Sequence, residues 1–343
     1  MLCMVLLALS HPFVLTAIAS FAATLLVTWL LIPRMKRFGF VGVDLNKVPA
    51  GLSIQKIKEL KEKGSGKLPT IPRGGGIAII FGMEFGMLLS LAVFPYKELA
   101  LILAALLSIT IIGAIGIIED FLHIRQFYRV LLPGVAALPL MAVNAGSTQM
   151  VVPFFGNIDF GLLYPLLLVP IGVVAASNLI NLLAGFNGLE AGVGAIVGSA
   201  LFAVAYSSGN SEAALISAAL VASCLAFLVF NWFPAKIFPG NSATYLIGAA
   251  IAGIVIVGNM ERVGVIALAP QIIEFFLKAA SKFKAENFGR VDKQGRLHYE
   301  GPVRSLSHVV MKLFKPTEQQ LVLILLGVQA VFALLAVWSA SLV

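Results

Sequence analysis

Polar side chains that could do chemistry gather at a few points of an otherwise apolar chain. The segment "SNLINLLAGFNGLEAG" carries three amides and a carboxylate, on Asn178, Asn181, Asn187 and Glu190. Asn178 and Asn181 are three residues apart, so they share one face of a helix. Gly185 and Gly188 then permit a tight turn, which places Glu190 in the first turn of a second helix. A helix start that follows glycines is a good binding place for an anionic group.

A pair of adjacent acids stands at the end of another apolar run. Glu119 and Asp120 are followed by Arg129, and further amides occur in "NWFPAKIFPGNSATY". Carboxylates and amides beside cations suit Mg²⁺, which prefers oxygen ligands and keeps water and substrate phosphate in its shell. Arg and Lys would neutralise the remaining phosphate charge. Two plainer alternatives stay open: the acids are solvated at a membrane interface, and the asparagines join helices by hydrogen bonds.

The elements that must position these residues are membrane helices. The chain has 343 residues, 59% of them hydrophobic and 12% charged, and its mean hydropathy is +0.99. Apolar runs of about 20 residues recur, which is the length that crosses a bilayer as a helix. Helices also satisfy their own backbone hydrogen bonds in lipid. We therefore predict an all-α polytopic membrane protein, a single domain over 1–343, with about ten transmembrane helices at 11–32, 74–94, 99–118, 130–146, 161–180, 189–207, 212–230, 243–258, 262–281 and 320–341.

Basic residues orient the predicted helices. All of the 24 Lys and Arg residues except Lys97 and Arg262 fall in segments that reach the same side, and the positive-inside rule makes that side cytoplasmic. Both termini are then expected outside, with a small extracytoplasmic hairpin near 147–160. A basic amphipathic stretch within 52–67 predicts a helix on the cytoplasmic surface of the membrane. The cytoplasmic loops are predicted at 33–73, 119–129, 181–189, 231–242 and 282–319.

The basic face of the protein has two interpretations. Its net charge of +8 is explained by topology together with attraction to anionic lipid head groups. Alternatively, some of these cations bind an anionic substrate. The lipid bilayer is an expected partner in either case, and no nucleic acid is expected.

Five motifs carry a family resemblance: "DLNK" (44–47), "EDFLHIRQFYRVLLP" (119–133), "NLINLLAGFNGLEAG" (178–192), "NWFPAKIFPGNSATY" (231–245) and "GRVDKQGRL" (289–297). In this order they resemble the polyprenyl-phosphate N-acetylhexosamine-1-phosphate transferases, which are glycosyltransferase family 4. Within that family, the chain looks most like the eukaryotic and archaeal dolichyl-phosphate GlcNAc-1-phosphate transferases. A single motif would not be specific, but their order and spacing are.

The resemblance implies an enzyme with ten transmembrane helices and a cytoplasmic active site. The implied reaction transfers a HexNAc-1-phosphate, expected to be GlcNAc-1-phosphate, from a UDP-N-acetylhexosamine to a polyprenyl or dolichyl phosphate and releases UMP. Such a reaction is the first membrane step of lipid-linked oligosaccharide synthesis for N-glycosylation of proteins. The lack of eukaryotic inserts favours an archaeal source, and thus the cell membrane. A homodimer is a further expectation.

The resemblance also implies roles for individual residues. The expected catalytic residues are Glu119, Asp120 and Arg129, with Asp120 positioning or deprotonating the acceptor phosphate. Because the acceptor phosphate is largely dianionic at neutral pH, the positioning role is the more convincing one. Mg²⁺, or Mn²⁺ in its place, would be held by Asn181 and Asn241. Substrate contacts are implied for Asp44, Asn46, Lys47, Asn178, Asn187, Gly188, Leu189, Glu190 and Arg290.

The chain departs from the family pattern at two of these positions. Residue 119 is Glu where the pattern has Asp, and residue 241 is Asn where most members carry Asp. The loss of a carboxylate at Asn241 leaves a second candidate open, a catalytically impaired homologue that still binds a UDP-sugar. A third candidate is a multipass transporter of lipid phosphates or solutes. It predicts polar residues deep in several spans, on both sides of the membrane midplane.

Overall fold

A computed structural model describes residues 11–44, 69–122, 125–152 and 156–342, without the side chains of Gln126, Arg129, Val151 and Val152. Within these ranges, eight helices are long and apolar enough to cross a membrane. They confirm the predicted all-α polytopic membrane protein. These helices are α2 (Pro12–Arg37), α4 (Gly76–Val93), α5 (Leu99–Phe121), the pair η3 (Tyr164–Leu168) and α8 (Val169–Leu182), α9 (Leu189–Ser207), α10 (Ser211–Asn231), α11 (Gly240–Gly258) and α15 (Glu318–Ala340).

The fourth predicted helix is wrong in its extent and continuity. The chain is already helical at Gln126, and it is broken into three short pieces, α6 (Gln126–Leu131), the 3₁₀ helix η2 (Leu132–Ala137) and α7 (Leu138–Ala142). Pro133 and Pro139 stand at the starts of η2 and α7. A proline has no N–H to donate and its ring crowds the preceding turn, so a continuous α-helix cannot form here.

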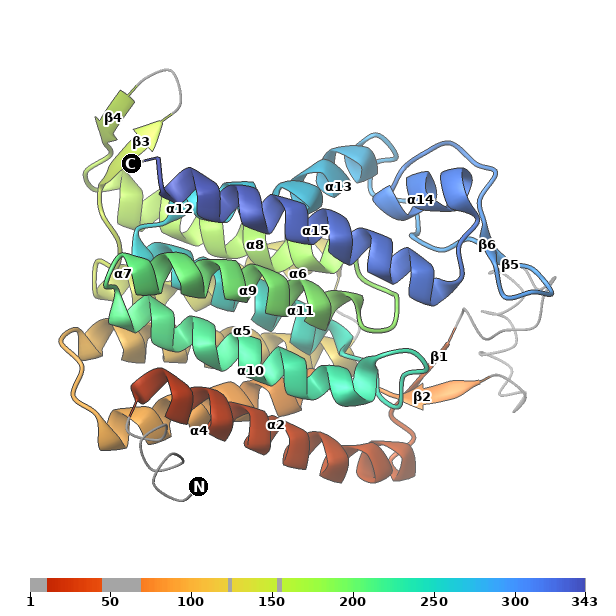
Figure 1. The fold of residues 1–343 in the computed structure, drawn as a ribbon, viewed down its shortest axis with the longest axis horizontal. Coiled ribbons are helices and arrows are strands. Elements are labelled where there is room, and N and C mark those ends of the chain that lie inside the picture. The colour runs from red at the N-terminus through yellow and green to blue at the C-terminus, as the bar shows by residue number, and fades with distance from the viewer. Residues whose placement is uncertain (1–10, 45–68, 123–124, 153–155, 343) are drawn as a thin grey trace.

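The ninth predicted helix is likewise interrupted. It consists of α12 (Glu261–Ala267) and α13 (Ala269–Ala279), which meet at Leu268 just before Pro270. The break frees α13 to take its own direction relative to α12. In Figure 1, α13 lies above α15, next to the loops that follow it.

The bundle has an inner and an outer layer of helices (Figure 1). In α11, 83% of the most apolar stretch is buried inside the protein, against 33% in each of α2 and α15. Large apolar side chains are exposed on the outer helices, among them Trp29, Phe81 and Trp338. Such a surface suits hydrocarbon, because water would penalise it.

The two ends of the bundle differ in structure. One end is called here the loop end. It carries α14 (Leu306–Phe314) and two antiparallel strand pairs, β1 (Val41–Val43) with β2 (Thr70–Pro72) and β5 (Arg290–Val291) with β6 (Leu297–His298). The other end, the hairpin end, carries β3 (Gln149–Val152) paired with β4 (Gly156–Asp159). This pairing confirms the hairpin expected near 147–160. The start of α2 and the end of α15 also lie at the hairpin end (Figure 1).

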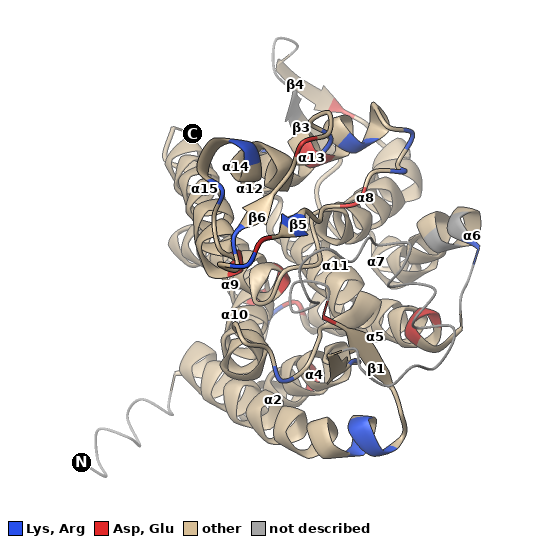
Figure 2. Cartoon of the chain, turned by 90° about the vertical axis from the view of Figure 1, so that its right-hand side faces the viewer, with Lys and Arg blue, Asp and Glu red and all other residues tan. Residues whose placement is uncertain are grey.

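Charged residues occur at the loop end, which faces the viewer in Figure 2. Lys and Arg residues are visible there at the end of α2, on the β5–β6 hairpin and near α14. The expected surface helix at 52–67 and the residues Asn46 and Lys47 lie outside the described part of the chain. The predicted loop 119–129 is shorter than expected, because α5 continues to Phe121 and α6 begins at Gln126.

Candidate active site

A cavity of about 1200 Å³ opens at the loop end of the bundle. One part of its wall is polar and the other is apolar. The polar part includes Asp44, Arg73, Asn178, Asn181, Asn187, Glu190, Asn231, Asn241, Thr244, Lys278, Glu286 and Asn287. The apolar part includes Val130 of α6, Val174 of α8, and Ile272, Phe275 and Phe276 of α13.

The two asparagines of α8 line the cavity from the same helix face, as their spacing predicts. Asn178 donates to the carbonyl oxygens of Val174, at 2.8 Å, and of Val130 in α6, at 3.3 Å. It therefore joins two helices, which supports the plainer interpretation of this residue. Asn181 lies one turn further on, and its Nδ2 donates to Asn241 Oδ1 at 3.4 Å. That contact brings the signature motif and the start of α11 together.

The loop between α8 and α9 is fixed through its backbone N–H groups. Gly185 and Gly188 take positive φ angles of 124° and 89°, which confirms the tight turn expected of them. Gly185 N donates to Glu190 Oε1 at 2.8 Å, and Asn187 N donates to Glu318 Oε1 at 2.9 Å. Gly188 N donates at 3.1 Å to Asn231 Oδ1. The carboxylates and the amide thus shape the loop that borders the cavity.

A second set of contacts holds the start of α11 against the end of α5. Asp120 Oδ1 accepts from Asn241 N at 2.8 Å, and Oδ2 accepts from Ser242 N at 3.1 Å and Ser242 Oγ at 2.7 Å. A carboxylate that accepts the first N–H groups of a helix stabilises its N-terminus. Gly240 has a φ of 75°, and a Cβ there would collide with the Asp120 carboxylate. Asp120 therefore lies behind the cavity wall and sets the position of Asn241.

Glu119 makes a different contact with the same residue. Its Oε1 accepts from Asn241 Nδ2 at 3.1 Å, and its side chain is buried. The Asn241 backbone is thus held by one acid of the pair and its side chain by the other. Both acids belong to the last turn of α5, whereas the prediction placed them at the start of a loop over 119–129.

Two cations line the cavity among the described residues, and neither was singled out from the sequence. Arg73 follows β2, where its N–H donates to Phe40 O at 3.1 Å, and its side chain is 33% exposed. Its Nη2 lies 3.8 Å from Asp120 Oδ1. Lys278 of α13 is buried, and its Nζ donates to Ala285 O at 2.7 Å. Only their charge and their place next to predicted cytoplasmic segments could have indicated them.

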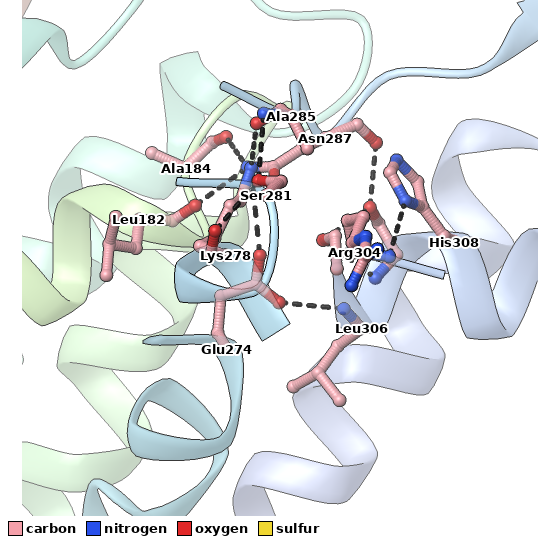
Figure 3. A network of polar contacts seen from close by, with 12 residues as sticks. Leu182, Ala184, Glu274, Lys278, Ser281, Ala285, Asn287, Arg304, Leu306 and His308 are labelled. Carbon is pink, nitrogen blue, oxygen red and sulfur yellow. Dashed lines mark hydrogen bonds and ion pairs between the residues drawn. The ribbon is translucent and has the colours of Figure 1, made fainter. Parts of the chain in front are cut away.

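A network around the last loop ties three elements together (Figure 3). Asn287 Nδ2 donates to the carbonyl oxygens of Leu182 and Ala184, at 2.9 and 2.8 Å, so this loop grips the end of α8. Glu274 Oε2 accepts from Leu306 N at 2.7 Å, and Glu274 Oε1 lies 3.9 Å from Lys278 Nζ. The network links α13, the last loop and α14, and it borders the cavity through Lys278 and Asn287.

The expected site residues fall into three groups. Cavity-lining residues are Asp44, Asn178, Asn181, Asn187, Glu190 and Asn241. Residues that are described but not part of the lining are Glu119, Asp120, Gly188, Leu189 and Arg290. Outside the description lie Asn46, Lys47 and the side chain of Arg129, although the Arg129 backbone is helical. Arg290 is exposed on β5, so its role in substrate binding stays a prediction.

The residues that the sequence reasoning missed are mostly anchors. Asn231 stands in a motif that was noticed, and it both accepts from Gly188 N and donates to Ile237 O at 2.9 Å. Glu318 opens α15 and accepts from the signature loop, 131 residues away in the chain. A contact over that distance leaves no local pattern. The amide types alone could have indicated Asn231 and Asn287, because buried amides need partners.

The donor set fits a hard divalent cation. Asn181 and Asn241 place two amides in contact at one point of the cavity wall, with the Glu119 carboxylate directly behind them. In the described part of the chain, no three His, Cys, Asp or Glu side chains cluster closely enough to hold a metal ion by themselves. A cation such as Mg²⁺ would therefore depend on the amide oxygens, on water and on the phosphates of a ligand, and substrate phosphates are common ligands of Mg²⁺ in proteins.

Comparison with known proteins agrees with this arrangement. Residues 102–259 match the sequence profile of glycosyl transferase family 4, a range that includes Glu119, Asp120, Asn181 and Asn241. A protein of Saccharolobus solfataricus is 38% identical over 320 residues, which are 93% of this chain and 94% of that protein. The chain belongs to glycosyl transferase family 4.

Two further relatives are less similar to this chain than the Saccharolobus solfataricus protein is. The phospho-N-acetylmuramoyl-pentapeptide-transferase of Halalkalibacterium halodurans is 32% identical over 308 residues, 85% of this chain and 89% of its own. The UDP-N-acetylglucosamine–dolichyl-phosphate N-acetylglucosaminephosphotransferase of Dictyostelium discoideum is 28% identical over 306 residues, 77% of this chain and 71% of its own. The Saccharolobus solfataricus protein is provisionally named as a UDP-N-acetylglucosamine–dolichyl-phosphate N-acetylglucosaminephosphotransferase.

Proposed function

We propose that this protein transfers GlcNAc-1-phosphate from UDP-GlcNAc to dolichyl phosphate or a related polyprenyl phosphate, with release of UMP. The main support is the cavity at one end of the bundle of membrane helices, because one part of its wall is polar and another part is apolar. A nucleotide sugar needs polar and cationic partners, and a polyprenyl phosphate needs an apolar path for its chain. The names of the relatives, which include both substrates, support the same assignment.

The apolar wall supports the lipid part of the proposal. Val130, Phe275 and Phe276 line the cavity and are 41%, 41% and 66% exposed. α6 and α13 thus present exposed apolar surface at the cavity. A polyprenyl chain could lie along this surface in the bilayer while its phosphate enters the cavity, so the lipid would not have to leave the membrane.

The reaction is a displacement at phosphorus. An oxygen of the lipid phosphate attacks the β-phosphorus of UDP-GlcNAc and forms a new P–O–P bond. The bond from the β-phosphorus to the bridging oxygen breaks, and its electron pair leaves with UMP. The attacking phosphate has a second pKa near 6, so at neutral pH it is largely dianionic and hardly needs a base. Positioning two anions and neutralising their charge is then the main task of the protein.

The residues divide that task among them. Arg73 and Lys278 bring positive charge to the cavity wall, and Asn181 and Asn241 would hold Mg²⁺ or Mn²⁺. When bound, such a cation supplies charge neutralisation for the phosphates. Asp120 keeps Asn241 in place and serves as a positioning residue, and we expect no proton transfer to it.

The two competing functions make different predictions. An impaired homologue would bind UDP-GlcNAc without releasing UMP. This alternative rests on Asn241, which lacks the carboxylate that most family members carry at this position. A transporter would move a substrate across the membrane unchanged. The described polar cavity lies at one end of the bundle, which favours an enzyme that works at one membrane face.

One assay separates the three candidates. The full-length protein in lipid vesicles is given UDP-GlcNAc, polyprenyl phosphate and Mg²⁺, and UMP is measured. Transferase activity predicts UMP release that requires both the lipid phosphate and the cation, and that stops with EDTA. Release of UMP without the lipid acceptor would indicate a hydrolase. Binding of UDP-GlcNAc without release of UMP would indicate the impaired homologue. Uptake of intact UDP-GlcNAc into the vesicles would indicate a transporter.

A further inference from the structure

The two positions at which the sequence departs from the family pattern touch each other. Glu119 and Asn241 are 122 residues apart in the chain, yet Glu119 Oε1 accepts from Asn241 Nδ2 at 3.1 Å. Neither departure could be interpreted alone, since one lengthens a side chain and the other removes a charge. Their contact indicates that the two changes belong together.

This contact decides which atom of the Asn241 amide faces the cavity. The amide nitrogen donates to Glu119 Oε1, so the nitrogen is the end of the amide that faces Glu119. The amide oxygen then points the other way, where it meets the Nδ2 of Asn181 at 3.4 Å. The contacts at both ends of the amide, Nδ2 with Glu119 and Oδ1 with Asn181, hold it in this orientation, while Asp120 fixes the Asn241 backbone through its N–H. The oxygen is the atom that a divalent cation needs.

The extra methylene of Glu119 is part of the same arrangement. An Asp at this position would withdraw the carboxylate by about 1.5 Å, the length of one carbon–carbon bond. The acceptor would then stand beyond hydrogen-bonding distance of Asn241 Nδ2. The amide at 241 could turn either end toward the cavity, and its cation-binding oxygen would be present only part of the time.

We propose that Glu119 is a positioning residue that holds the Asn241 amide with its oxygen toward the cavity, so that Asn241 can serve a divalent cation without a carboxylate of its own. The inference rests on the proposed function, because that function requires a divalent cation at this point. It makes residues 119 and 241 one coupled unit, with Glu–Asn and Asp–Asp as its two working combinations.

A double-variant cycle tests the coupling. Full-length protein, in nanodiscs with saturating UDP-GlcNAc, is titrated with Mn²⁺, and bound Mn²⁺ is followed by electron paramagnetic resonance. We expect Glu119→Asp to weaken Mn²⁺ binding by about 10- to 100-fold, the usual effect of losing the partner that orients a metal ligand. Glu119→Gln should weaken it similarly, because a Gln amide can face Asn241 with either end. The double variant Glu119→Asp/Asn241→Asp should recover binding at least to the wild-type level.

A matched control separates this effect from general damage. Glu212 is also a buried Glu that accepts a hydrogen bond, from Glu98 N at 3.3 Å, but it belongs to the hairpin end. Glu212→Asp should leave the Mn²⁺ titration unchanged. Thermal unfolding in EDTA identifies any variant that has failed to fold, and Asn241→Asp provides the fourth corner of the cycle, with Mn²⁺ binding tighter than in the wild type.

The inference fails if Glu119→Asp and Glu119→Gln bind Mn²⁺ as the wild type does. It also fails if Glu119→Asp weakens Mn²⁺ binding by the same factor in the Asn241→Asp variant as in the wild type, because the two positions would then act independently. The proposed function fails separately, if wild-type protein releases no UMP although the cycle shows the expected coupling. Conversely, lipid-dependent UMP release without coupling would leave the function standing and would remove the role of Glu119.

Discussion

The two ends of the bundle use the same residue types in different ways. At the hairpin end, polar side chains join helices directly: Tyr164 donates to Glu261, Asn210 Nδ2 donates to Val257 O at 3.2 Å, and Arg262 Nη2 donates to Ser339 O at 2.6 Å. At the loop end, carboxylates and amides accept from the backbone of the segments around the cavity, as Asp120, Glu190 and Glu318 do. The first arrangement closes the bundle, and the second keeps a cavity wall in shape.

The difference explains why few of the buried acids need to touch a substrate. Asp120 accepts two backbone N–H groups and one hydroxyl, and such hydrogen bonds to a carboxylate are strong. What the cavity gains is a fixed set of amide oxygens and cations. Removing an anchor at the loop end should therefore affect activity as well as stability, whereas the same change at the hairpin end should affect stability alone.

The largest effect is expected for Asp120→Ala. The change leaves Asn241 N, Ser242 N and Ser242 Oγ without their acceptor in a buried place. We expect the protein to lose about 3 kcal/mol of stability, and kcat to fall by about 100-fold or more, because the displaced Asn241 misaligns the site. Denaturation in detergent and the UMP-release assay measure the two quantities.

Asp120→Asn tests what the carboxylate itself does. It keeps one acceptor oxygen, so it should retain appreciable activity with an unchanged pH profile. An inactive Asp120→Asn that regains activity at high pH would show that Asp120 accepts a proton. As the counterpart from the hairpin end, Glu212→Ala should lower stability while kcat per folded protein stays the same.

A smaller effect is expected for Asn231→Ala. Asn231 is fully buried and joins Gly188 N to Ile237 O, so its loss frees the signature loop at one point. We expect KM for UDP-GlcNAc to rise roughly 30-fold, which corresponds to about 2 kcal/mol for a lost buried anchor. KM for the polyprenyl phosphate should change little. Equal increases in both KM values would mean that the loop does not serve the nucleotide sugar in particular.

Arg73→Ala should have a more modest effect. Its guanidinium is one-third exposed and partly paired with Asp120, so its contribution to binding an anion is screened by water. We expect about a tenfold loss in kcat/KM, equal to about 1.4 kcal/mol, and partial recovery in Arg73→Lys. The matched variant is Arg290→Ala, on the exposed β5 strand. A larger loss in Arg290→Ala than in Arg73→Ala would favour the family-based assignment over the one based on the cavity.

The sequence predicted what depends on composition and local spacing. The apolar runs predicted the membrane helices, and the spacing of Asn178 and Asn181 predicted their shared helix face. The breaks at Pro133 and Pro270 do not follow from the apolar runs, because an apolar run indicates the length of a helix and not its continuity. The anchors Glu318 and Asn287 were missed because their partners are more than 100 residues away.

The last prediction concerns His308 at the loop end. It affects the dependence of stability on pH, and it has the smallest expected effect on activity. Burial lowers the pKa of His308 from 6.5 to about 4, and its neutral ring accepts from Arg304 N at 3.3 Å while it stacks on Tyr299 (Figure 3 shows the contact with Arg304). The unfolded chain therefore binds a proton that the folded chain excludes between these pH values. The stabilisation should be nearly complete above pH 7 and fall as the pH drops toward 4, with a loss of about 0.8 kcal/mol at pH 6.

Thermal unfolding between pH 4 and 7.5 measures this slope. His308→Asn supplies an oxygen near the place of Nδ1 but cannot be protonated, so its stability should lose most of the dependence on pH in that window. His298→Asn is the matched change on the β5–β6 hairpin, where His298 pairs with Asp292 at 2.8 Å on a partly exposed surface. The slope should persist in His298→Asn. If His308→Asn keeps the wild-type slope, His308 is not the source of the dependence of stability on pH.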